Sequence, residues 1–230
     1  MKKLSKRLSI LKSLIKKDAY SISDAVALVK NFQTAKFSES VEAHISLNLN
    51  PKYPNQQLRA SFILPNGTGK ELKIAVLTQN EDIQSALDFG ATIAGFESLL
   101  DDISKGIITF DVLITTPQLM PKLAKFGKIL GPKSLMPSPK AGTVTTNLKE
   151  TIQEFKKGKV EYRCDKTGIV HLIFGKTSFS KEFLEQNLKA IYDSIEKNKP
   201  SNLKGKYFDS FYICTTMSPS IRLDLTSFKL

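Results

Sequence analysis

The chain has 230 residues, of which 41% are hydrophobic and 24% charged, a balance that is ordinary for a folded, soluble protein. Its 34 basic and 22 acidic residues give a formal net charge of +12, which favours a nucleic-acid or anionic-membrane partner. No apolar run approaches the roughly 18 residues of a membrane span, so we expect no spanning segment.

The first segment, residues 1–17, carries seven basic residues and no acidic one. Its apolar positions Leu4, Leu8, Leu11 and Ile15 recur on one face of a helix. The segment lacks the continuous apolar region and the small-residue cleavage site of a secretory signal. Because it runs directly into the next element, we prefer a basic helix over an organelle transit peptide.

The next part of the chain predicts a helix followed by antiparallel strands. Ser21, with Asp24 three residues later, resembles a capping box, and a helix should follow through Lys30. Residues 41–49 alternate apolar and polar side chains, which is typical of a strand with one wet face. Residues 59–64 are expected to form its return strand.

After Gly69 the sequence pattern changes from alternating strands to short apolar segments separated by helices. Short apolar segments at residues 72–77, 92–95 and 112–115 alternate with helix-length segments at 81–89, 97–105 and 148–157, and Gly158 is a plausible C-cap. This alternation indicates a parallel, doubly wound α/β unit.

Strand-like alternation returns after Gly158. Residues 160–164 predict a strand, residues 165–168 a turn and residues 169–174 the return strand. A long helix at 180–197 has Phe183, Leu184, Leu188, Ile191 and Ile195 on its apolar face, and strands at 208–215 and 221–225 follow.

The two ends of the chain therefore share an antiparallel α+β style. We predict an interrupted α+β domain (residues 1–67 and 159–230) and an inserted Rossmann-like α/β domain (residues 68–158). The crossings lie near Gly67, Gly69 and Gly158, and we interpret these glycines as a hinge.

The Gly-Thr-Gly-Lys run at residues 67–70 invites a phosphate-loop interpretation, which fails. A phosphate loop needs Gly where Leu64 stands and Ser or Thr where Glu71 stands. A dinucleotide fingerprint fails too, because Leu72 occupies the third Gly position. A small nucleotide-using α/β enzyme stays open as the disfavoured alternative, which ATP or NAD binding would revive.

Two carboxylates, Glu39 and Glu42, lie near a strand start beside Lys36 and Phe37. As a general acid/base pair they would need a neighbour that perturbs their pKa, and the sequence offers none. They fit a solvated strand edge, or acids that order basic side chains or accept hydrogen bonds from ribose hydroxyls or base edges.

Cysteine and histidine usage argues against a metal centre. Cys164 and Cys214 lie in strand-like runs and indicate a reducing compartment without a disulfide framework. His44 and His171 are the only histidines, and no zinc-binding spacing connects them with the cysteines. We therefore expect satisfied histidines, no metal ligands and no cofactor.

Residues 127–145 form a run with three Gly, three Pro and three Lys (Lys128, Lys133 and Lys140). From Val112 to Lys149 there are six Lys and no acidic residue. Gly and Pro shape such a loop, and its charge suits a polyanion surface. A solvated lid over a globular domain is the alternative.

Six segments, taken together, resemble the ribosomal protein L-one family, the protein of the mobile stalk on the large ribosomal subunit. They are residues 36–44, 64–70, 127–145, 162–168, 204–207 and 215–220, in family order over nearly the whole chain. The resemblance implies a non-enzymatic ribosomal protein whose interrupted domain binds large-subunit rRNA and whose inserted domain is Rossmann-like. It also implies contact with departing exit-site tRNA and, in bacteria, translational repression through the protein's own mRNA. The implied location is the ribosome, as a monomer, in plastid stroma or bacterial cytoplasm.

Carried over by motif, the rRNA surface would use Lys36, Phe37, Glu39, Glu42, Arg163, Asp165, Lys166, Thr167, Thr216, Met217 and Ser218. The basic run of the inserted domain would contact tRNA. The chain departs from the family at Ser218 and Ser134, where the family usually has Gly. Ser218 puts affinity at an RNA-contacting turn in doubt, and Ser134 is expected to alter the signature loop without changing the fold.

Overall fold

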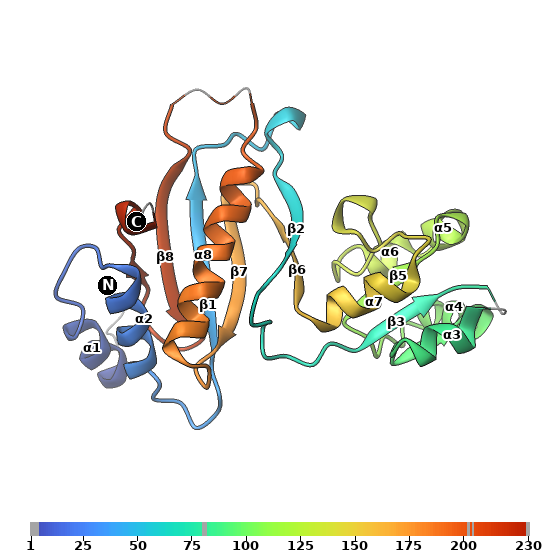
Figure 1. Cartoon of the computed structure of the whole chain (residues 1–230), viewed down its shortest axis with the longest axis horizontal. Coiled ribbons are helices and arrows are strands. Elements are labelled where there is room, and N and C mark those ends of the chain that lie inside the picture. Colours follow the sequence, from blue (N-terminus) through green and yellow to red (C-terminus); the bar gives the residue numbers. More distant parts are fainter. Residues whose placement is uncertain (1–4, 80–81, 202, 204, 229–230) are drawn as a thin grey trace. The chain divides into compact units, whose positions relative to one another are not determined.

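A computed structural model of the chain describes residues 5–79, 82–201, 203 and 205–228. The chain forms two compact units: unit 1 is Met1–Gly69 with Tyr162–Leu230, and unit 2 is Lys70–Glu161 (Figure 1). Unit 1 is antiparallel α+β and unit 2 is parallel α/β, so the predicted fold class is confirmed. Leu4, Glu81 and Lys204, which the sequence analysis used, lie outside the described residues.

The sheet of unit 1 has four strands in the order β7-β1-β8-β9. β1 (Ser40–Leu47) pairs antiparallel with both β7 (Ile169–Lys176) and β8 (Phe208–Thr215). The short β9 (Ile221–Arg222) extends the sheet beside β8. Segments from both ends of the chain thus share one sheet.

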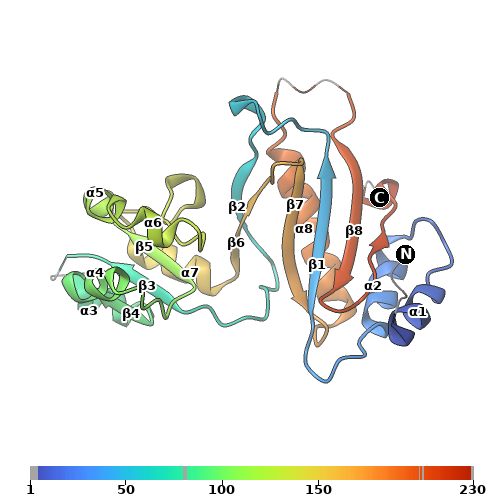
Figure 2. The same cartoon turned by 180° about the vertical axis from the view of Figure 1, so that it is seen from behind.

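Helices pack on one face of this sheet. α2 (Ile22–Asn31) and α8 (Lys181–Lys197) begin after Ser21 and Ser180, and each serine hydroxyl accepts a hydrogen bond from an N–H of the first turn. The odd-numbered residues of β1 are buried beneath these helices, whereas the even-numbered residues are half-buried on the other face. Figure 2 shows that face of β7, β1 and β8 with no helix in front of it.

The basic N-terminal segment forms the helix α1 (Lys6–Ser13), which is shorter than predicted. On its predicted apolar face Leu11 is buried, and Leu8 and Ile15 are half-buried. The helix α8 likewise follows its predicted face, except that Phe183 is exposed.

The predicted pairing of residues 59–64 with residues 41–49 is wrong. β2 (Arg59–Ile63) pairs with β6 (Lys159–Arg163), and both edges of β1 are taken by the eight-residue strands β7 and β8. β2 lacks the alternating burial of β1, so it has no face to place under the helices. The predicted hairpin of residues 160–174 is reduced to one bridge, Cys164 with Val170.

The sheet of unit 2 has three parallel strands in the order β4-β3-β5. These are β3 (Ile74–Leu77), β4 (Ile93–Gly95) and β5 (Val112–Thr115). All four residues of β3 are buried, because alternate side chains enter two separate cores. A strand buried on both faces is typical of a doubly wound sheet.

Helices supply the other side of each core. Leu99 and Ile103 of α4 (Glu97–Ser104) pack against one face of the sheet. Ala86 of α3 (Ile83–Asp88) and Ile152 of α7 (Leu148–Lys156) pack against the other. The predicted α/β alternation is confirmed.

The Gly- and Pro-rich run at residues 127–145 is folded onto unit 2 and is no lid. It follows η3 (Pro117–Leu119) and α5 (Met120–Ala124), and it forms α6 (Gly127–Leu130) and η4 (Pro139–Ala141). Leu130 is buried in the core, and Val144 makes a parallel bridge to Thr115 of β5. The run is therefore anchored at both ends.

The turn after α6 is closed by a residue in the left-handed conformation. Ser134 has φ 57°, the N–H of Ser134 donates to the carbonyl of Gly131, and the N–H of Leu135 donates to the carbonyl of Leu130. This pattern of two bonds is a Schellman motif, whose left-handed position glycine normally fills. Ser134 occupies that position here, so the turn stores backbone strain.

The three predicted hinge glycines all have positive φ: 64° at Gly67, 73° at Gly69 and 102° at Gly158. Gly67 is held firmly within unit 1, because the buried Asn187 donates to its carbonyl at 2.9 Å and to that of Phe174 at 2.8 Å. The Asn187 side chain also accepts from the N–H of Asn66 at 3.0 Å. Hinge motion at this crossing therefore stays a prediction, restricted to residues after Gly67.

Among the described residues, no helix is both long enough and apolar enough to cross a membrane.

Replacing Ser134 with Gly should stabilise unit 2 by about 0.5–1 kcal/mol, because glycine adopts the left-handed conformation without the Cβ penalty. Thermal unfolding should show a midpoint raised by a few degrees, roughly as expected for a unit of this size. Ser138, in the same run, has an extended backbone with φ −144° and is the matched control. Ser138→Gly should be neutral or destabilising; equal stabilisation by both variants would refute the strain at Ser134.

Candidate nucleic-acid interface

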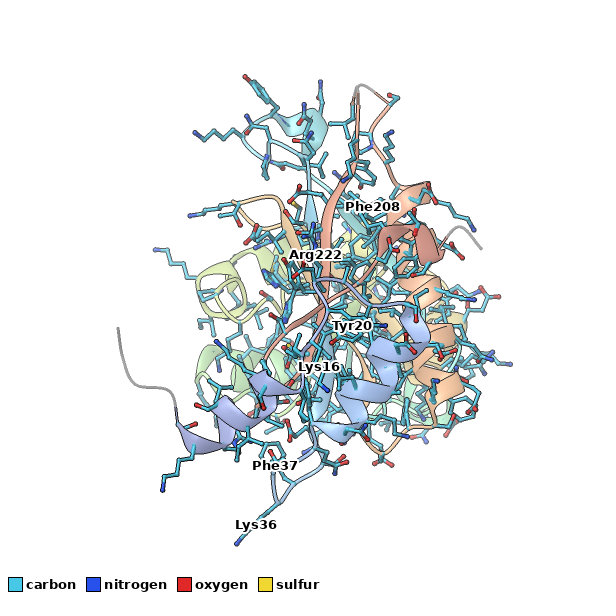
Figure 3. All side chains as sticks on the ribbon, turned by 90° about the vertical axis from the view of Figure 1, so that its left-hand side faces the viewer. Lys16, Tyr20, Lys36, Phe37, Phe208 and Arg222 are labelled. Carbon is cyan, nitrogen blue, oxygen red and sulfur yellow. The ribbon has the colours of Figure 1, made fainter. Side chains whose placement is uncertain are left out.

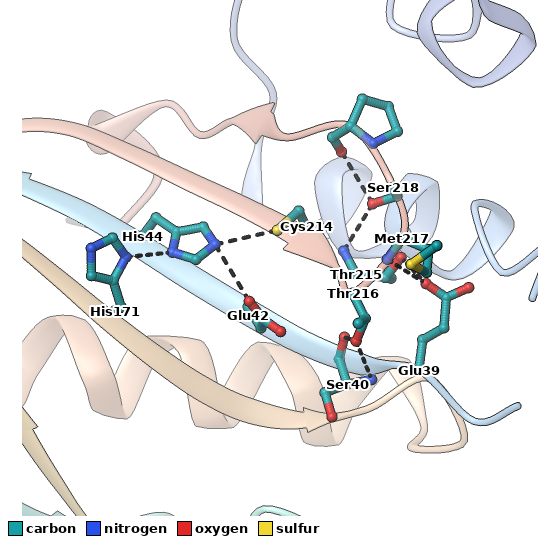
Figure 4. A network of polar contacts seen from close by, with 11 residues as sticks. Glu39, Ser40, Glu42, His44, His171, Cys214, Thr215, Thr216, Met217 and Ser218 are labelled. Atoms are coloured by element: carbon teal, nitrogen blue, oxygen red, sulfur yellow. Dashed lines mark hydrogen bonds and ion pairs between the residues drawn. The ribbon is translucent and has the colours of Figure 1, made fainter. Parts of the chain in front are cut away.

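A buried carboxylate joins two segments of unit 1 at one end of the sheet. The side chain of Glu39 is 0% exposed. Its Oε2 accepts from the Thr215 hydroxyl at 2.6 Å and from the N–H of Met217 at 3.0 Å (Figure 4). Its Oε1 accepts from the N–H of Ala35 at 3.3 Å. The loop 34–39 is thereby fixed to the turn 215–218, and we call this arrangement the Glu39 junction.

The hydrogen bonds of the Glu39 junction set the charge of the carboxylate. Burial alone would raise the pKa of Glu39, but the bonds from Thr215, Met217 and Ala35 together outweigh it and lower the pKa. The carboxylate is thus charged at neutral pH and directed inward. Because Glu39 is buried and its carboxylate bonds inward, its side chain is not on the surface where the sequence analysis placed it; its hydrogen bonds order the loop and the turn from beneath.

Further bonds strengthen the same junction. Ser40 donates its N–H to the Thr216 hydroxyl at 3.1 Å, and the N–H of Thr216 donates to the Ser40 carbonyl at 3.1 Å. From α1, the Arg7 guanidinium donates to the Met217 carbonyl at 2.8 Å and to the Thr34 hydroxyl at 2.9 Å. Arg7 therefore bridges the loop and the turn from outside.

Ser218 fits its turn without strain. Its hydroxyl accepts from the N–H of Thr215 at 2.8 Å and donates to the Pro219 carbonyl at 3.1 Å. Within the described part of the chain, Ser134 is the one non-glycine residue with positive φ, so the backbone of Ser218 suits any residue. Both hydrogen bonds of the Ser218 hydroxyl are therefore made to backbone groups of the turn and the residue after it.

The junction presents side chains outward. Lys36 and Thr216 are exposed, Phe37 is 53% exposed, and Met217 is 47% exposed. Figure 3 shows Lys36 and Phe37 projecting from the same loop. The hydrogen-bonded loop and turn therefore expose four different chemical groups to solvent: a cation, an aromatic ring, a hydroxyl and a thioether.

The predicted residues of the turn 163–167 form a second cluster at the far end of β1. Ser40 pairs with Lys176 and Ser46 with Ile169, so the turn 165–168 lies beside the end of β1 opposite the Glu39 junction. With about 3.3 Å per residue, the eight residues of β1 separate the clusters by roughly 25 Å. Arg163, Lys166 and Thr167 are exposed there.

Asp165 organises this second turn. Its carboxylate accepts from the N–H groups of Thr167 and Ile169, each at 2.8 Å, and from the Thr167 hydroxyl at 2.7 Å. Burial would raise the pKa of Asp165, but these bonds outweigh it and lower the pKa to about 2. Asp165, like Glu39, holds a loop in shape.

A row of polar side chains crosses the open face between the two clusters. The His44 ring places Nδ1 at 2.8 Å from His171 Nδ1, and Nε2 at 3.3 Å from Cys214 Sγ and 3.7 Å from Glu42 Oε2. His171 Nε2 lies 3.6 Å from Asp165 Oδ2. Glu42 therefore faces this row, away from the Glu39 junction hydrogen bonds.

The side chains of this row are buried enough to shift the pKa values of His44 and Cys214. Burial, and then repulsion by His171, lower the pKa of His44, and the charge of Glu42 offsets this only in part. Burial, and then the charge of Glu42, raise the pKa of the Cys214 thiol to about 11. At neutral pH His44 is thus a neutral imidazole beside a protonated thiol.

The basic run belongs to unit 2, whereas the rRNA candidates belong to unit 1. Lys128, Lys133 and Lys140 are all exposed. They belong to the acid-free stretch that the sequence analysis found. Lys128 lies in α6, Lys133 in the turn after it and Lys140 in η4.

Two features of the candidate site escaped the sequence analysis. Arg7 lies in a recognisably basic helix, but its bonds to Thr34 and Met217 span 27 and 210 residues of sequence and carry no local signal. The row of Glu42, His44, Cys214 and His171 was also missed, because its members come from three strands.

The chain matches the model of the Ribosomal protein L1p/L10e family over residues 29–219. It is 56% identical over 227 residues to the large ribosomal subunit protein uL1c of Porphyra purpurea, covering 99% of each chain. It is 54% identical to uL1c of Rhodomonas salina, covering 100% of this chain and 98% of that protein. It is 52% identical to the large ribosomal subunit protein uL1 of Prochlorococcus marinus (strain NATL1A), covering 100% and 97% respectively.

Glu39→Gln should destabilise unit 1 by about 1.5–3 kcal/mol, because a neutral amide with one oxygen cannot accept all three charge-assisted bonds. A lowered folded-state pKa means that the stabilisation is present above the ordinary value of 4.5 and is lost as the pH falls through the folded-state pKa. The difference between native protein and Glu39→Gln should therefore shrink in acid. Denaturant unfolding at pH 7 and in acid measures it.

Glu42→Gln is the matched control, because the half-buried Glu42 carboxylate has a 3.7 Å contact with His44 and lies outside the junction. Its effect at pH 7 should be much smaller. Equal destabilisation by the two variants would contradict the special role of Glu39.

Proposed function

Because the chain belongs to the Ribosomal protein L1p/L10e family, whose members are structural, non-enzymatic components of the ribosome, we propose that unit 1 binds large-subunit rRNA at the mobile stalk near the exit site. The plastid uL1c and cyanobacterial uL1 relatives indicate a ribosomal location, in plastid stroma or bacterial cytoplasm. We propose that the protein acts there as a monomer.

The Glu39 junction is the observation that carries the rRNA proposal. Lys36 can contact phosphate, Phe37 can stack on an unpaired base, and Thr216 can meet a ribose hydroxyl. Since their loop and turn are fixed to each other before binding, little conformational entropy is lost on association. Small exposed turn residues also allow close approach of the RNA backbone.

The second cluster extends this surface. Arg163, Lys166 and Thr167 lie one strand length from the junction, and Asp165 holds their turn in shape. A spacing of roughly 25 Å suits a folded RNA that touches both ends of the sheet and exceeds the reach of a single nucleotide. This distance favours a structured stalk over a nucleotide ligand, and hence RNA binding over the enzyme alternative.

We propose that the basic run of unit 2 contacts exit-site tRNA and assists the release of deacylated tRNA. Lys128, Lys133 and Lys140 are exposed cations in a unit that lacks the Glu39 junction. Because phosphate contacts need no base sequence, such a surface suits a partner that changes identity every cycle.

We also propose that the unit 1 surface binds the protein's own mRNA and represses translation. A messenger segment shaped like the stalk would meet the same Lys36, Phe37 and Thr216 side chains. An mRNA leader fragment should then displace stalk rRNA competitively, and simultaneous binding of both RNAs would refute a shared surface.

Phe37→Ala should weaken stalk rRNA binding roughly 5- to 150-fold, the range for loss of one base–aromatic stack. Phe183→Ala is the matched control, because Phe183 is similarly exposed (47% against 53%) but lies on α8, which covers the other face of the sheet. Affinities are measured by filter binding at one fixed salt concentration, since they depend steeply on salt. Equal weakening by both variants would place the interface elsewhere.

Replacing Lys128, Lys133 and Lys140 together with Ala should leave stalk rRNA affinity nearly intact and weaken tRNA contact. The matched control replaces Lys105, Lys149 and Lys157, three other exposed lysines of unit 2, and removes the same charge. Both triple variants are assembled into ribosomes, and the rate of deacylated tRNA release is measured. A loss of rRNA binding in the first variant would show that the two surfaces are assigned wrongly.

A further inference from the structure

Three metal-ligating side chains of different chemistry converge on the open face of unit 1. Glu42 and His44 come from β1, and Cys214 comes from β8, where it stands directly opposite Glu42. One ligand atom from each, namely a carboxylate oxygen, a ring nitrogen and the sulfur, lies within 4.8 Å of the other two. Figure 4 shows Glu42 and Cys214 both directed toward the same edge of the His44 ring.

The spacing of these atoms suits one ion. A tetrahedral zinc ion with bonds of about 2.0–2.3 Å keeps its ligand atoms roughly 3.3–3.6 Å apart. His44 Nε2 lies 3.3 Å from Cys214 Sγ and 3.7 Å from Glu42 Oε2. Both distances are close to that range, and the third pair, Glu42 with Cys214, lies within 4.8 Å.

The other side of the His44 ring is arranged to support such a ligand. If His44 binds an ion through Nε2, its Nδ1 carries the proton and donates to His171 Nδ1 at 2.8 Å. His171 then carries its own proton on Nε2, which faces the Asp165 carboxylate at 3.6 Å. A metal-ligating histidine commonly donates its other ring N–H to an outer-shell acceptor, and here that acceptor is His171, with the Asp165 carboxylate on its far side.

We propose that Glu42, His44 and Cys214 form a binding site for one zinc-class divalent ion, with His171 and Asp165 positioning the His44 ring. Zinc sites in proteins are built from cysteine sulfur, histidine nitrogen and carboxylate oxygen, and this cluster has one of each. Mg²⁺ and Ca²⁺, in contrast, prefer oxygen ligands alone. When the ion binds, the Cys214 S–H bond breaks, its proton passes to solvent, and a sulfur–metal bond forms.

The site is half-buried and has three protein ligands, so its fourth position is open to solvent. Its affinity should therefore be below that of a closed four-ligand structural site. The proposal does not depend on the RNA function, because binding is a property of the chain without RNA.

Titration of the full-length, RNA-free protein with Co²⁺, a spectroscopic substitute for Zn²⁺, tests the proposal. We expect a thiolate-to-cobalt charge-transfer absorption that saturates at one ion per chain and disappears when Zn²⁺ is added. Cys214→Ser and His44→Gln should each abolish it. Cys164→Ser is the matched control and should retain it, because Cys164 is the other free thiol and stands outside the cluster.

The positioning role of His171 has a separate readout. His171→Ala should keep the charge-transfer band but weaken Co²⁺ binding roughly 10- to 100-fold, as expected for loss of an outer-shell partner. Circular dichroism verifies that each variant is folded. Absence of the band in native protein at millimolar Co²⁺, or its persistence in folded Cys214→Ser, would overturn the site; unchanged affinity in His171→Ala would overturn the positioning role.

Discussion

The candidate RNA surface of this protein depends on one buried carboxylate. Glu39 accepts hydrogen bonds from the loop before β1, from the last residue of β8 and from the turn after it. Its shortest hydrogen bond, 2.6 Å, comes from Thr215, which is 176 residues away along the sequence. A buried charge with too few donors would destabilise the fold, so the donors must be in place for unit 1 to be stable. The loop that carries the exposed side chains of Lys36 and Phe37 is consequently held in place by the hydrogen bonds of Glu39.

The second constraint is that helices cover the unit 1 sheet on one face. The odd-numbered residues of β1 fill the core beneath α2 and α8, and the even-numbered residues are left to form a polar row. A shift of one residue in the pairing would exchange the two sets, so the hydrophobic pattern fixes the polar row as firmly as it fixes the core. Glu42, His44 and Cys214 meet on this face because of that register.

Ser134 and Ser218, the two positions at which the resemblance led us to expect glycine, differ in what the serine does to its turn. At Ser134 the backbone is left-handed, and the side chain adds strain to a Schellman turn. At Ser218 the backbone is unstrained, and the hydroxyl accepts from the N–H of Thr215 and donates to the carbonyl of Pro219. Serine therefore strains the backbone of the turn at residue 134, whereas at residue 218 its hydroxyl adds hydrogen bonds within the turn.

Local patterns in the sequence determined the element types, the mixed α+β and α/β fold class and the family, because periodicity, caps and ordered motifs act over short stretches. The capping serine Ser21, the strand 208–215 and the alternation of the inserted unit are examples. Which strands pair was decided by the tertiary structure, since β2 pairs with β6 and leaves β1 to two longer strands. The inward role of Glu39, the bridge from Arg7 and the meeting of His44 with Cys214 were decided there too. Each of these joins residues that are distant along the chain, and only the packing of the whole sheet fixes which side chains become neighbours.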